Sequence, residues 1–335
     1  MLAAPTTRHT TLTPGPDASP IVLDRPQVQA LITARDARCA VEASLLAVAG
    51  AQAVLPDELA MALPAGEVHV KGGHLLTSKY AALKVASGFP HNSELGLPVN
   101  NGFTLVLNAD TGELVASLLE NGWLTEMRTG AAGAVAAQHL ARPDAAHLAL
   151  IGAGAQARFQ LQALREVRNI TRVRIWNRTA ARAHALAAEL SEQHDIACCV
   201  PETPRAAIAG ADIVVTGTAS RDPLIRADWL EPGIHITAMG SDFSEKQELD
   251  NDVLGRADLV VADDVGTCSR VGELHHALAA GFIDVSRVLS LADVVGGKAP
   301  GRTSPDQITV ADQCGLGVYD AAIADTVLAR YLASQ

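Results

Sequence analysis

The segment AHLALIGAGAQA, residues 146–157, joins an apolar run to closely spaced small residues. Its first half predicts a buried parallel strand, and its second half predicts the tight turn that opens a helix. Gly152, Gly154 and Ala157 have the spacing of the dinucleotide-binding pattern. In that pattern the first glycine permits the turn, the second lets the backbone approach a pyrophosphate, and the third small residue lets the helix pack on the strand. Free N–H groups at the helix start would then meet the phosphate charge.

The chain after this segment alternates between predicted strands and helices. A helix over residues 156–167 and a strand over residues 173–177 complete a βαβ unit. A helix over residues 179–192 follows, with further strands at residues 196–200, 212–216, 234–239 and 259–262. The alternation predicts an α/β fold with a Rossmann-type, doubly wound parallel sheet.

The first part of the chain has a different pattern. Residues 28–53 have the spacing of two amphipathic helices with a break near residues 36–38. Four β-prone runs follow, at residues 67–71, 80–85, 102–107 and 114–119, with a loop at residues 88–98 and a hairpin turn at residues 108–112. An Ala-rich helix over residues 130–140 would link this antiparallel α+β part to the glycine segment. A last helix over residues 317–332 could return to it and make it discontinuous.

Composition narrows the class of protein. With 335 residues, 48% of them hydrophobic and 19% charged, the chain is long enough for two domains and predicts a globular protein. The net charge of −11 and the 3% of aromatic residues argue against a nucleic-acid partner, and no apolar run is long enough to span a membrane. The five scattered cysteines predict a reducing compartment, with Cys198 and Cys199 in the core. The polar first 20 residues predict a frayed tail rather than a signal peptide, so we expect a cytoplasmic protein.

The end of the second strand of the βαβ unit predicts which coenzyme is bound. An acidic residue there would accept hydrogen bonds from a ribose 2′-hydroxyl and repel a 2′-phosphate, but this sequence has Asn177, Arg178 and Thr179. A guanidinium and a hydroxyl suit a phosphate, so NADP(H) is favoured and NAD(H) stays possible. The alternative is a surface arginine beside a helix-capping threonine.

Two later strand ends offer small and hydroxyl-bearing residues where a nicotinamide ribose could lie, because ligands bind at the carboxyl ends of strands in open sheets. These residues are Thr216, Thr218, Ala219, Met239, Gly240 and Ser241. Asp242 is the carboxylate at the second of these ends, and it is a candidate proton carrier. Its alternative role is to form a turn or cap a helix.

The first part of the chain contributes cations. Lys71, Lys84 and Arg128 lie in or beside predicted strands, where a partly buried cation needs an anion such as a substrate carboxylate. The alternative is solvent-facing charge, which we prefer for Lys79. The segment Glu273-Leu274-His275-His276 matches no metal-binding spacing and predicts polar residues on a helix surface, so no metal site is expected.

From about residue 67 to residue 320 the chain resembles the ornithine cyclodeaminase/mu-crystallin family. The resemblance is carried by LTEMRTGAA at residues 124–132, by the glycine segment with Gln156, by GSD at residues 240–242 with KQEL at 246–249, and by ITVADQCG at 308–315. AMGSD at residues 238–242, KQELD at 246–250, GELHHA at 272–277 and LPVNNG at 97–102 look most like the ectoine-utilisation cyclodeaminase-like branch. That branch is also similar to imine reductases that act on small dicarboxylic imines.

The resemblance implies a homodimer with a substrate-binding and dimerisation domain, residues 1–128 and 316–335, and an NAD(P)-binding Rossmann domain, residues 129–315. It implies that Lys84 and Arg128 bind a substrate carboxylate and that Asp242 handles protons at the reacting carbon. Lys71 is the nearest cation to a further family arginine that has no clear counterpart here. The residues assigned to the coenzyme are Gly152, Gly154, Ala155, Gln156, Ala157, Asn177, Arg178, Thr179, Thr216, Thr218, Ala219, Met239, Gly240, Ser241 and Gly315.

The chemistry so implied is hydride exchange between C4 of the nicotinamide and Cα of a small amino or imino acid. Three outcomes stay open at this point. An imine reductase or amino-acid dehydrogenase is favoured, because DFSEK at residues 242–246 replaces the Asp-x-Pro-Gly-Lys of the cyclodeaminases, and Cys314 stands where Ser or Thr is usual. The alternatives are a cyclodeaminase that releases ammonia from ornithine or a related diamino acid, and a crystallin-like NADPH-dependent binding protein without turnover.

Overall fold

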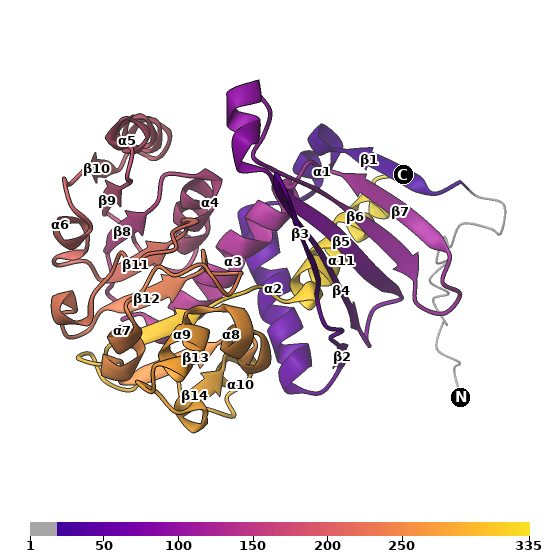
Figure 1. The fold of residues 1–335 in the computed structure, drawn as a ribbon. Helices are drawn as coiled ribbons and strands as arrows, with labels where there is room; N and C mark the ends of the chain where they lie inside the picture. Colours follow the sequence, from indigo (N-terminus) through magenta and orange to yellow (C-terminus); the bar gives the residue numbers. More distant parts are fainter. Residues whose placement is uncertain (1–18) are drawn as a thin grey trace, which may run out of the picture.

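Two β-sheets form the frame of the computed structural model, which describes residues 19–335 (Figure 1). One sheet is built from the first part of the chain and the other from the part that follows the glycine segment. Most of the segment for which a frayed tail is expected lies outside the described residues.

The second sheet is wholly parallel and has the strand order β10-β9-β8-β11-β12-β15-β13-β14. Its strands are β8 (His147–Ile151), β9 (Arg172–Trp176), β10 (Ala197–Cys199), β11 (Ile213–Thr216), β12 (His235–Ala238), β13 (Leu259–Ala262), β14 (Val288–Ser290) and β15 (Thr309–Asp312). The predicted α/β fold with a Rossmann-type sheet is confirmed. Strands β14 and β15 were not predicted, although β15 lies in the interior of the sheet.

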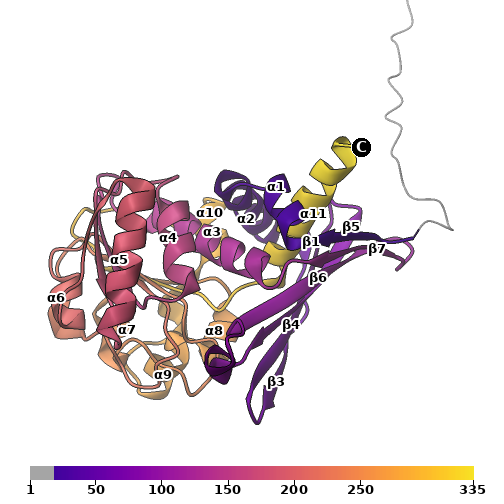
Figure 2. The same ribbon diagram turned by 90° about the horizontal axis from the view of Figure 1, so that it is seen from above.

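Alternate residues of β8 show that both faces of this sheet are covered. Leu148 and Leu150 belong to one apolar cluster, and Ala149 and Ile151 belong to another. The first cluster includes residues of α4 (Ala155–Leu164) and α5 (Ala180–His194); the second includes residues of α6 (Pro204–Ile208), α7 (Asn251–Arg256) and α9 (Glu273–Ala279). The remaining helices of this part are α8 (Val265–Val271) and α10 (Leu291–Val295) (Figure 2).

The first sheet has the order β1-β7-β6-β5-β4-β2, and β3 pairs with β4. Its strands are β1 (Ile21–Asp24), β2 (Ala53–Val54), β3 (Leu59–Leu63), β4 (Gly66–Leu75), β5 (Tyr80–Gly88), β6 (Asn100–Asn108) and β7 (Leu114–Leu119). The predicted β6–β7 hairpin is present, whereas β1, β2 and β3 were not predicted. The expected loop between β5 and β6 contains a short 3₁₀ helix, η1 (Pro90–Leu95).

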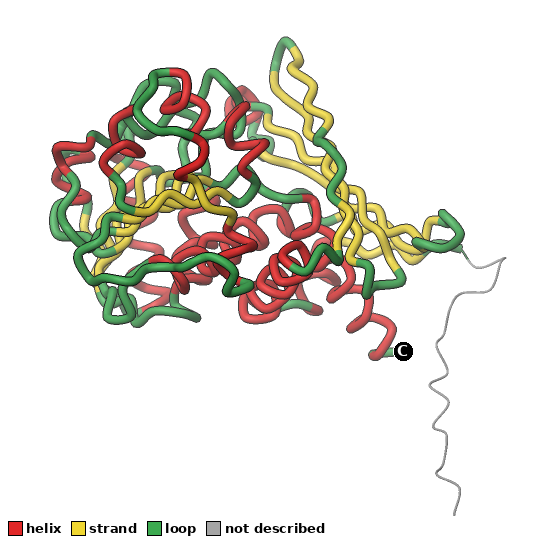
Figure 3. Tube along the Cα trace, turned by 90° about the horizontal axis from the view of Figure 1, so that it is seen from below, coloured by secondary structure: helices red, strands yellow, loops and turns green. Residues whose placement is uncertain are grey.

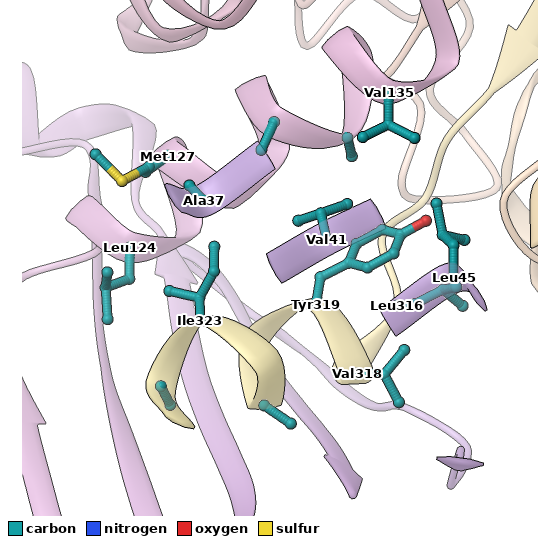
Figure 4. Close-up of a cluster of buried hydrophobic side chains, with 14 of the residues drawn as sticks. Ala37, Val41, Leu45, Leu124, Met127, Val135, Leu316, Val318, Tyr319 and Ile323 are labelled. Atoms are coloured by element: carbon teal, nitrogen blue, oxygen red, sulfur yellow. The ribbon is translucent and has the colours of Figure 1, made fainter. Parts of the chain in front are cut away.

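One face of the first sheet is covered by the last helix, α11 (Gly317–Ala333), and α2 (Ala34–Ala49) packs against α11 (Figures 2 and 3). Val41, Leu45, Tyr319 and Ile323 share a buried apolar cluster there (Figure 4). The predicted last helix therefore lies against the first part of the chain.

The break between the first two helices is earlier than predicted. Helix α1 (Arg25–Leu31) ends before Thr33, and α2 begins after it. Thr33 and Asp36 form a capping box, in which each side chain receives the other residue's backbone N–H. The expected break near residues 36–38 is wrong because Asp36 lies inside the first turn of α2 and stabilises its start.

The helix between the sheets, α3 (Trp123–Leu140), begins seven residues before the predicted start at residue 130. Gly122 has φ 80° and turns the chain into the helix, and the buried carboxylate of Glu120 accepts a hydrogen bond from the Leu124 N–H at 3.0 Å. Most of α3 is buried, because it packs against α4 on one side and α2 on another.

The start of α11 touches β4 backbone to backbone. A Cβ on Gly317 would overlap the carbonyl oxygen of Gly72, and a Cβ on Gly73 would lie 2.7 Å from the Val318 nitrogen. Only glycines permit this approach. It fixes the end of the chain next to Lys71, the neighbour of Gly72 on β4.

Candidate active site

The glycine turn opens into a cleft of about 750 Å³ at the carboxyl ends of β8, β9 and β11. Gly152 has φ 119°, and a Cβ there would lie 2.8 Å from the Gly217 carbonyl oxygen. A Cβ on Gly154 would meet no atom within 4 Å, so the backbone at the start of α4 is open to a ligand. Gly154 is the N-cap of α4 without a side-chain hydrogen bond to the first turn. This turn fits a pyrophosphate, because open backbone and free N–H groups converge on the cleft.

Eight of the residues assigned to the coenzyme line this cleft: Gly152, Gly154, Ala155, Asn177, Arg178, Thr179, Thr218 and Ala219. Gln156 and Met239 line a second, adjoining pocket instead. Ala157 lies in α4 and packs into the apolar core, and Thr216 is wholly buried. The buried Ser241 donates a hydrogen bond to the Lys246 carbonyl at 2.6 Å, and Gly240 and Gly315 are tightly packed by Glu248 and Arg128.

The end of β9 presents two arginines to the cleft. Arg178 and Thr179 are exposed at the start of α5, and Arg182, which was not predicted, lines the same cleft one helical turn later. Within residues 19–335 the structure gives neither guanidinium an ion pair or hydrogen-bond partner. Asn177 has a structural role instead: its Oδ1 accepts a hydrogen bond from the Ala153 N–H at 3.2 Å, and its Nδ2 donates one to the Thr179 carbonyl at 3.1 Å.

A buried carboxylate holds the two loops at the ends of β11 and β12. Glu248 accepts hydrogen bonds from the N–H and the hydroxyl of Thr218, at 2.6 and 2.7 Å, and from the Gly240 N–H at 2.9 Å. Burial raises the pKa of Glu248 to about 6, against the effect of these donors. Glu248 belongs to the quoted KQEL motif, but sequence reasoning gave it no role.

The second pocket, of about 180 Å³, brings together Lys71, Lys84, Arg128 and Asp242. It adjoins the first, because Asn100, Gly122 and Glu126 line both. Lys71 and Lys84 stand directly opposite one another on β4 and β5. These four residues are far apart in the sequence and were predicted from strand ends and motifs. The structure brings them into one site.

The opposed lysines are compatible because each has an anionic neighbour. Asp320, on α11, lies 3.2 Å from Lys84 through Oδ2 and 3.2 Å from the Arg128 Nε through Oδ1. Burial, followed by the charge of Arg128, lowers the pKa of Lys84 to about 7 despite Asp320. One carboxylate thus faces two cations, which leaves positive charge for a substrate carboxylate.

Lys71 is held by groups from two regions. Its Nζ donates hydrogen bonds to the carbonyls of Cys314 at 2.7 Å and Gly315 at 3.1 Å, and it lies 3.1 Å from Oε2 of Glu58. Sequence reasoning identified neither Glu58 nor Asp320, because nothing local indicates which carboxylate approaches which cation.

Asp242 lies in the loop after β12 and is bound by Lys246, whose Nζ is 2.6 Å from Oδ1. The same Nζ lies 3.1 Å from Oε1 of Glu67 on β4, so Lys246 joins the two sheets across the pocket. His69, also on β4, makes a T-shaped ring contact with Phe243. Strand β4 therefore places Glu67, His69 and Lys71 in the pocket, two residues apart along one face.

Two predictions outside the site are wrong, and one agrees with the structure. Glu273 is not on a helix surface: it is 2% exposed and accepts hydrogen bonds from the N–H groups of Glu248 and Leu249 at 2.8 and 3.0 Å. Cys199 is exposed and Cys198 is half-buried, because β10 is an edge strand. Lys79 is exposed, as expected.

Comparison with known proteins gives matches over almost the whole chain. The model of the ornithine cyclodeaminase/mu-crystallin family matches residues 19–335. An uncharacterized cyclodeaminase of Sinorhizobium fredii is 46% identical over 79% of this chain and 80% of its own length. An archaeal alanine dehydrogenase, described as a dimer with bound NAD, superposes with a TM-score of 0.87 at 33% identity over 94% of this chain and 97% of its own.

A third match contains both a coenzyme and an amino acid. The Δ1-pyrroline-2-carboxylate reductase of Thermococcus litoralis, in complex with NADH and L-proline, superposes with a TM-score of 0.90 at 30% identity, over 94% of this chain and 98% of its own. No helix within residues 19–335 is long and apolar enough to cross a membrane.

Proposed function

Because the chain belongs to the ornithine cyclodeaminase/mu-crystallin family, we propose that it is an NAD(P)H-dependent oxidoreductase that reduces a small imino acid to an amino acid. The observation that carries this proposal is the junction of the two cavities, a glycine-lined cleft and the pocket that holds Lys71, Lys84 and Arg128, which share Glu126. Relatives in this family reduce cyclic imines or act on alanine, and two solved neighbours hold NAD or NADH.

The coenzyme would be held by the open backbone of the glycine turn, with its nicotinamide end toward Thr218 and Met239. When bound, it supplies or accepts the hydride. Glu248 fixes the loops at this end, since it binds both Thr218 and Gly240. We assign coenzyme binding to residues 129–315, and substrate binding to residues 1–128 and 316–335.

We infer a preference for NADP(H) from the end of β9. Arg178 and Arg182 both line the cleft next to the hydroxyl of Thr179 at the start of α5. Two guanidiniums without carboxylate partners among the described residues are suited to a dianionic phosphate, and no acidic side chain lines this part of the cleft to accept a ribose hydroxyl.

The substrate carboxylate would lie between Lys84 and Arg128, with Lys71 as a third cation. This position would hold Cα near the boundary of the two cavities, which is the orientation that hydride exchange needs. Asp242 would lie at the reacting nitrogen, where its negative charge stabilises a protonated imine.

We also propose a homodimer formed through the outer face of the first sheet. Leu59, Met61 and Leu63 of β3 are 53, 43 and 43% exposed, and Leu83 and Phe103 on β5 and β6 are also exposed. A monomer rarely leaves so many large apolar side chains together on one sheet. The dimeric description of the alanine dehydrogenase neighbour supports this assembly.

A substrate screen tests the function. Oxidation of NADPH and NADH would be followed with Δ1-pyrroline-2-carboxylate, with pyruvate plus ammonia and with oxaloacetate plus ammonia. Consumption with at least one of them is the expected result. The second candidate, suggested by the cyclodeaminase relative, predicts ammonia release from ornithine or diaminobutyrate without net coenzyme change. Tight coenzyme binding without turnover in either assay would contradict both and favour a binding protein.

A further inference from the structure

One ionisable side chain in the second pocket has no role in the proposal above. His69 lies on β4 between Glu67 and Lys71, is 8% exposed, and lines the pocket with Asp242. A histidine in this position is able to carry a proton, which imine reduction requires in addition to the hydride.

Its two ring nitrogens have different surroundings. Nδ1 is hydrogen-bonded to Oε1 of Glu58; because a carboxylate only accepts, Nδ1 carries a hydrogen. Glu58 is held in turn by Lys71, 3.1 Å from its other oxygen. Nε2 is buried and has no hydrogen-bond partner among the described residues; the nearest carboxylate oxygen of Glu67 lies 3.8 Å away.

The charges around the ring favour the imidazolium. Glu58 precedes β3, Glu67 shares β4, and Asp242 comes from the loop after β12; Lys71 and Lys246 balance part of this charge. Burial opposes the charged form, but the Glu58 hydrogen bond and the nearby carboxylates of Glu67 and Asp242 outweigh it and raise the pKa of His69. The Phe243 ring makes a T-shaped contact with the imidazole, with 4.8 Å between the ring centroids, and covers one side of it.

We propose that His69, oriented by Glu58, is the proton donor to the substrate nitrogen, an inference that rests on the proposed imine reduction. The lone pair of the imine nitrogen takes the proton from Nε2, and the hydride then adds to the carbon of this protonated imine, so that the π pair of the C=N bond becomes the lone pair of the amine. An N–H bond forms, the Nε2–H bond breaks, and a neutral imidazole remains that regains its proton from water. In the oxidative direction the neutral imidazole accepts that proton.

The contacts of Asp242 support this division of roles. Its Oδ1 accepts a hydrogen bond from the Lys246 ammonium at 2.6 Å, so this oxygen is an acceptor. One polar atom each of Glu67, His69 and Asp242 lie within 4.8 Å of one another. A substrate nitrogen near Asp242 is therefore within reach of His69 Nε2 through a small movement.

The first experiment compares His69→Gln with His74→Gln, using the imino acid of the screen with the highest kcat. His74 is on the same strand, contacts the Tyr80 carbonyl and does not line the pocket, so it is the matched control. We expect kcat of His69→Gln to fall by about 10²-fold or more and to lose its decrease at alkaline pH, with coenzyme Kd within twofold of wild type. If the kcat and pH profile of His69→Gln were the same as those of the wild type, the inference would be overturned. The proposed function would still stand in that case, because the wild-type enzyme would still turn over.

The second experiment does not depend on turnover. The enzyme is labelled with ¹³C at histidine Cε1, and the NMR resonance of His69 is identified by its absence from His69→Gln. In the wild type this resonance should titrate with a midpoint above pH 6.5. Glu58→Gln should move the midpoint to lower pH. Glu58→Gln should also shift the alkaline decrease of kcat to lower pH. A midpoint below 6.5 in the wild type would overturn the role of His69 as a donor. Absence of any wild-type imine reduction would instead overturn the proposed function and this inference with it.

Discussion

Lys84 and Asp320 form an ion pair in the interior of the protein, with Nζ 3.2 Å from Oδ2 and with 2 and 5% of the two residues exposed. The pair joins the middle of β5 to the first turn of α11. Asp320 is shared with Arg128, so the pair alone does not neutralise the pocket. This arrangement makes the affinity for an anionic substrate sensitive to pH and to the loss of either partner.

We predict that KM for Δ1-pyrroline-2-carboxylate rises as the pH increases from 6 to 9. Burial lowers the pKa of Lys84 to about 7, so its positive charge is present below that pH and is lost above it. Initial rates across this range would measure the effect. The variant Lys84→Gln should have a high KM without this pH dependence; a wild-type KM that stays constant would contradict the role of Lys84.

Asp320→Asn should destabilise the protein by about 3–5 kcal/mol, because it leaves two buried cations without their anion. Urea unfolding followed by circular dichroism gives the change in unfolding free energy. Asp306→Asn makes the same change at an exposed site and should have little effect. If Asp320→Asn lowered the free energy of unfolding no more than this control does, the ion pair would contribute little to stability.

Arg178→Asp should weaken NADPH binding by about 10- to 100-fold and leave NADH binding nearly unchanged, because a charged hydrogen bond to the 2′-phosphate contributes about 1.5–3 kcal/mol. Fluorescence titration with both coenzymes provides the measurement. Arg205→Asp changes the same charge at an exposed position outside the cleft and controls for long-range electrostatics. Equal losses for the two coenzymes would refute the phosphate assignment.

Asp242→Asn should reduce kcat by about 10²-fold or more while coenzyme affinity stays near that of wild type. The amide keeps the shape of the side chain but removes the charge that would stabilise a protonated imine. Steady-state kinetics and coenzyme titration separate the two effects. Near-normal turnover would remove Asp242 from the mechanism.

Local patterns were sufficient for the strands β8, β11, β12 and β13, which are short and mostly apolar runs, and for β9, in which apolar and charged residues alternate. They were insufficient for β15. This strand lies between β12 and β13 in the sheet, although β12 and β13 follow one another among the predicted strands. Tertiary packing decides which strands become neighbours in a sheet, so a four-residue run such as Thr309–Asp312 gives little information about its neighbours.

The candidate site shows the same division. Lys71, Lys84, Arg128 and Asp242 were selected from strand ends and motifs, and the structure brings them to one pocket. The carboxylate partners of these residues were missed. The pairing of Asp320 with Lys84, for example, depends on the packing of α11 against the first part of the chain. Arg182 carried a usable signal: it lies in the helix predicted over residues 179–192, four residues after Arg178.

The contact of Gly317 with Gly72 has a consequence for biosynthesis. Because α11 supplies Asp320 and holds the strand that carries Lys71, the pocket is incomplete until α11 has left the ribosome. A nascent chain could form its parallel sheet, but it would expose the uncovered face of the first sheet to chaperones or to other chains. The pocket therefore forms only when α11 docks on the first sheet, a step that a truncation before residue 317 would prevent.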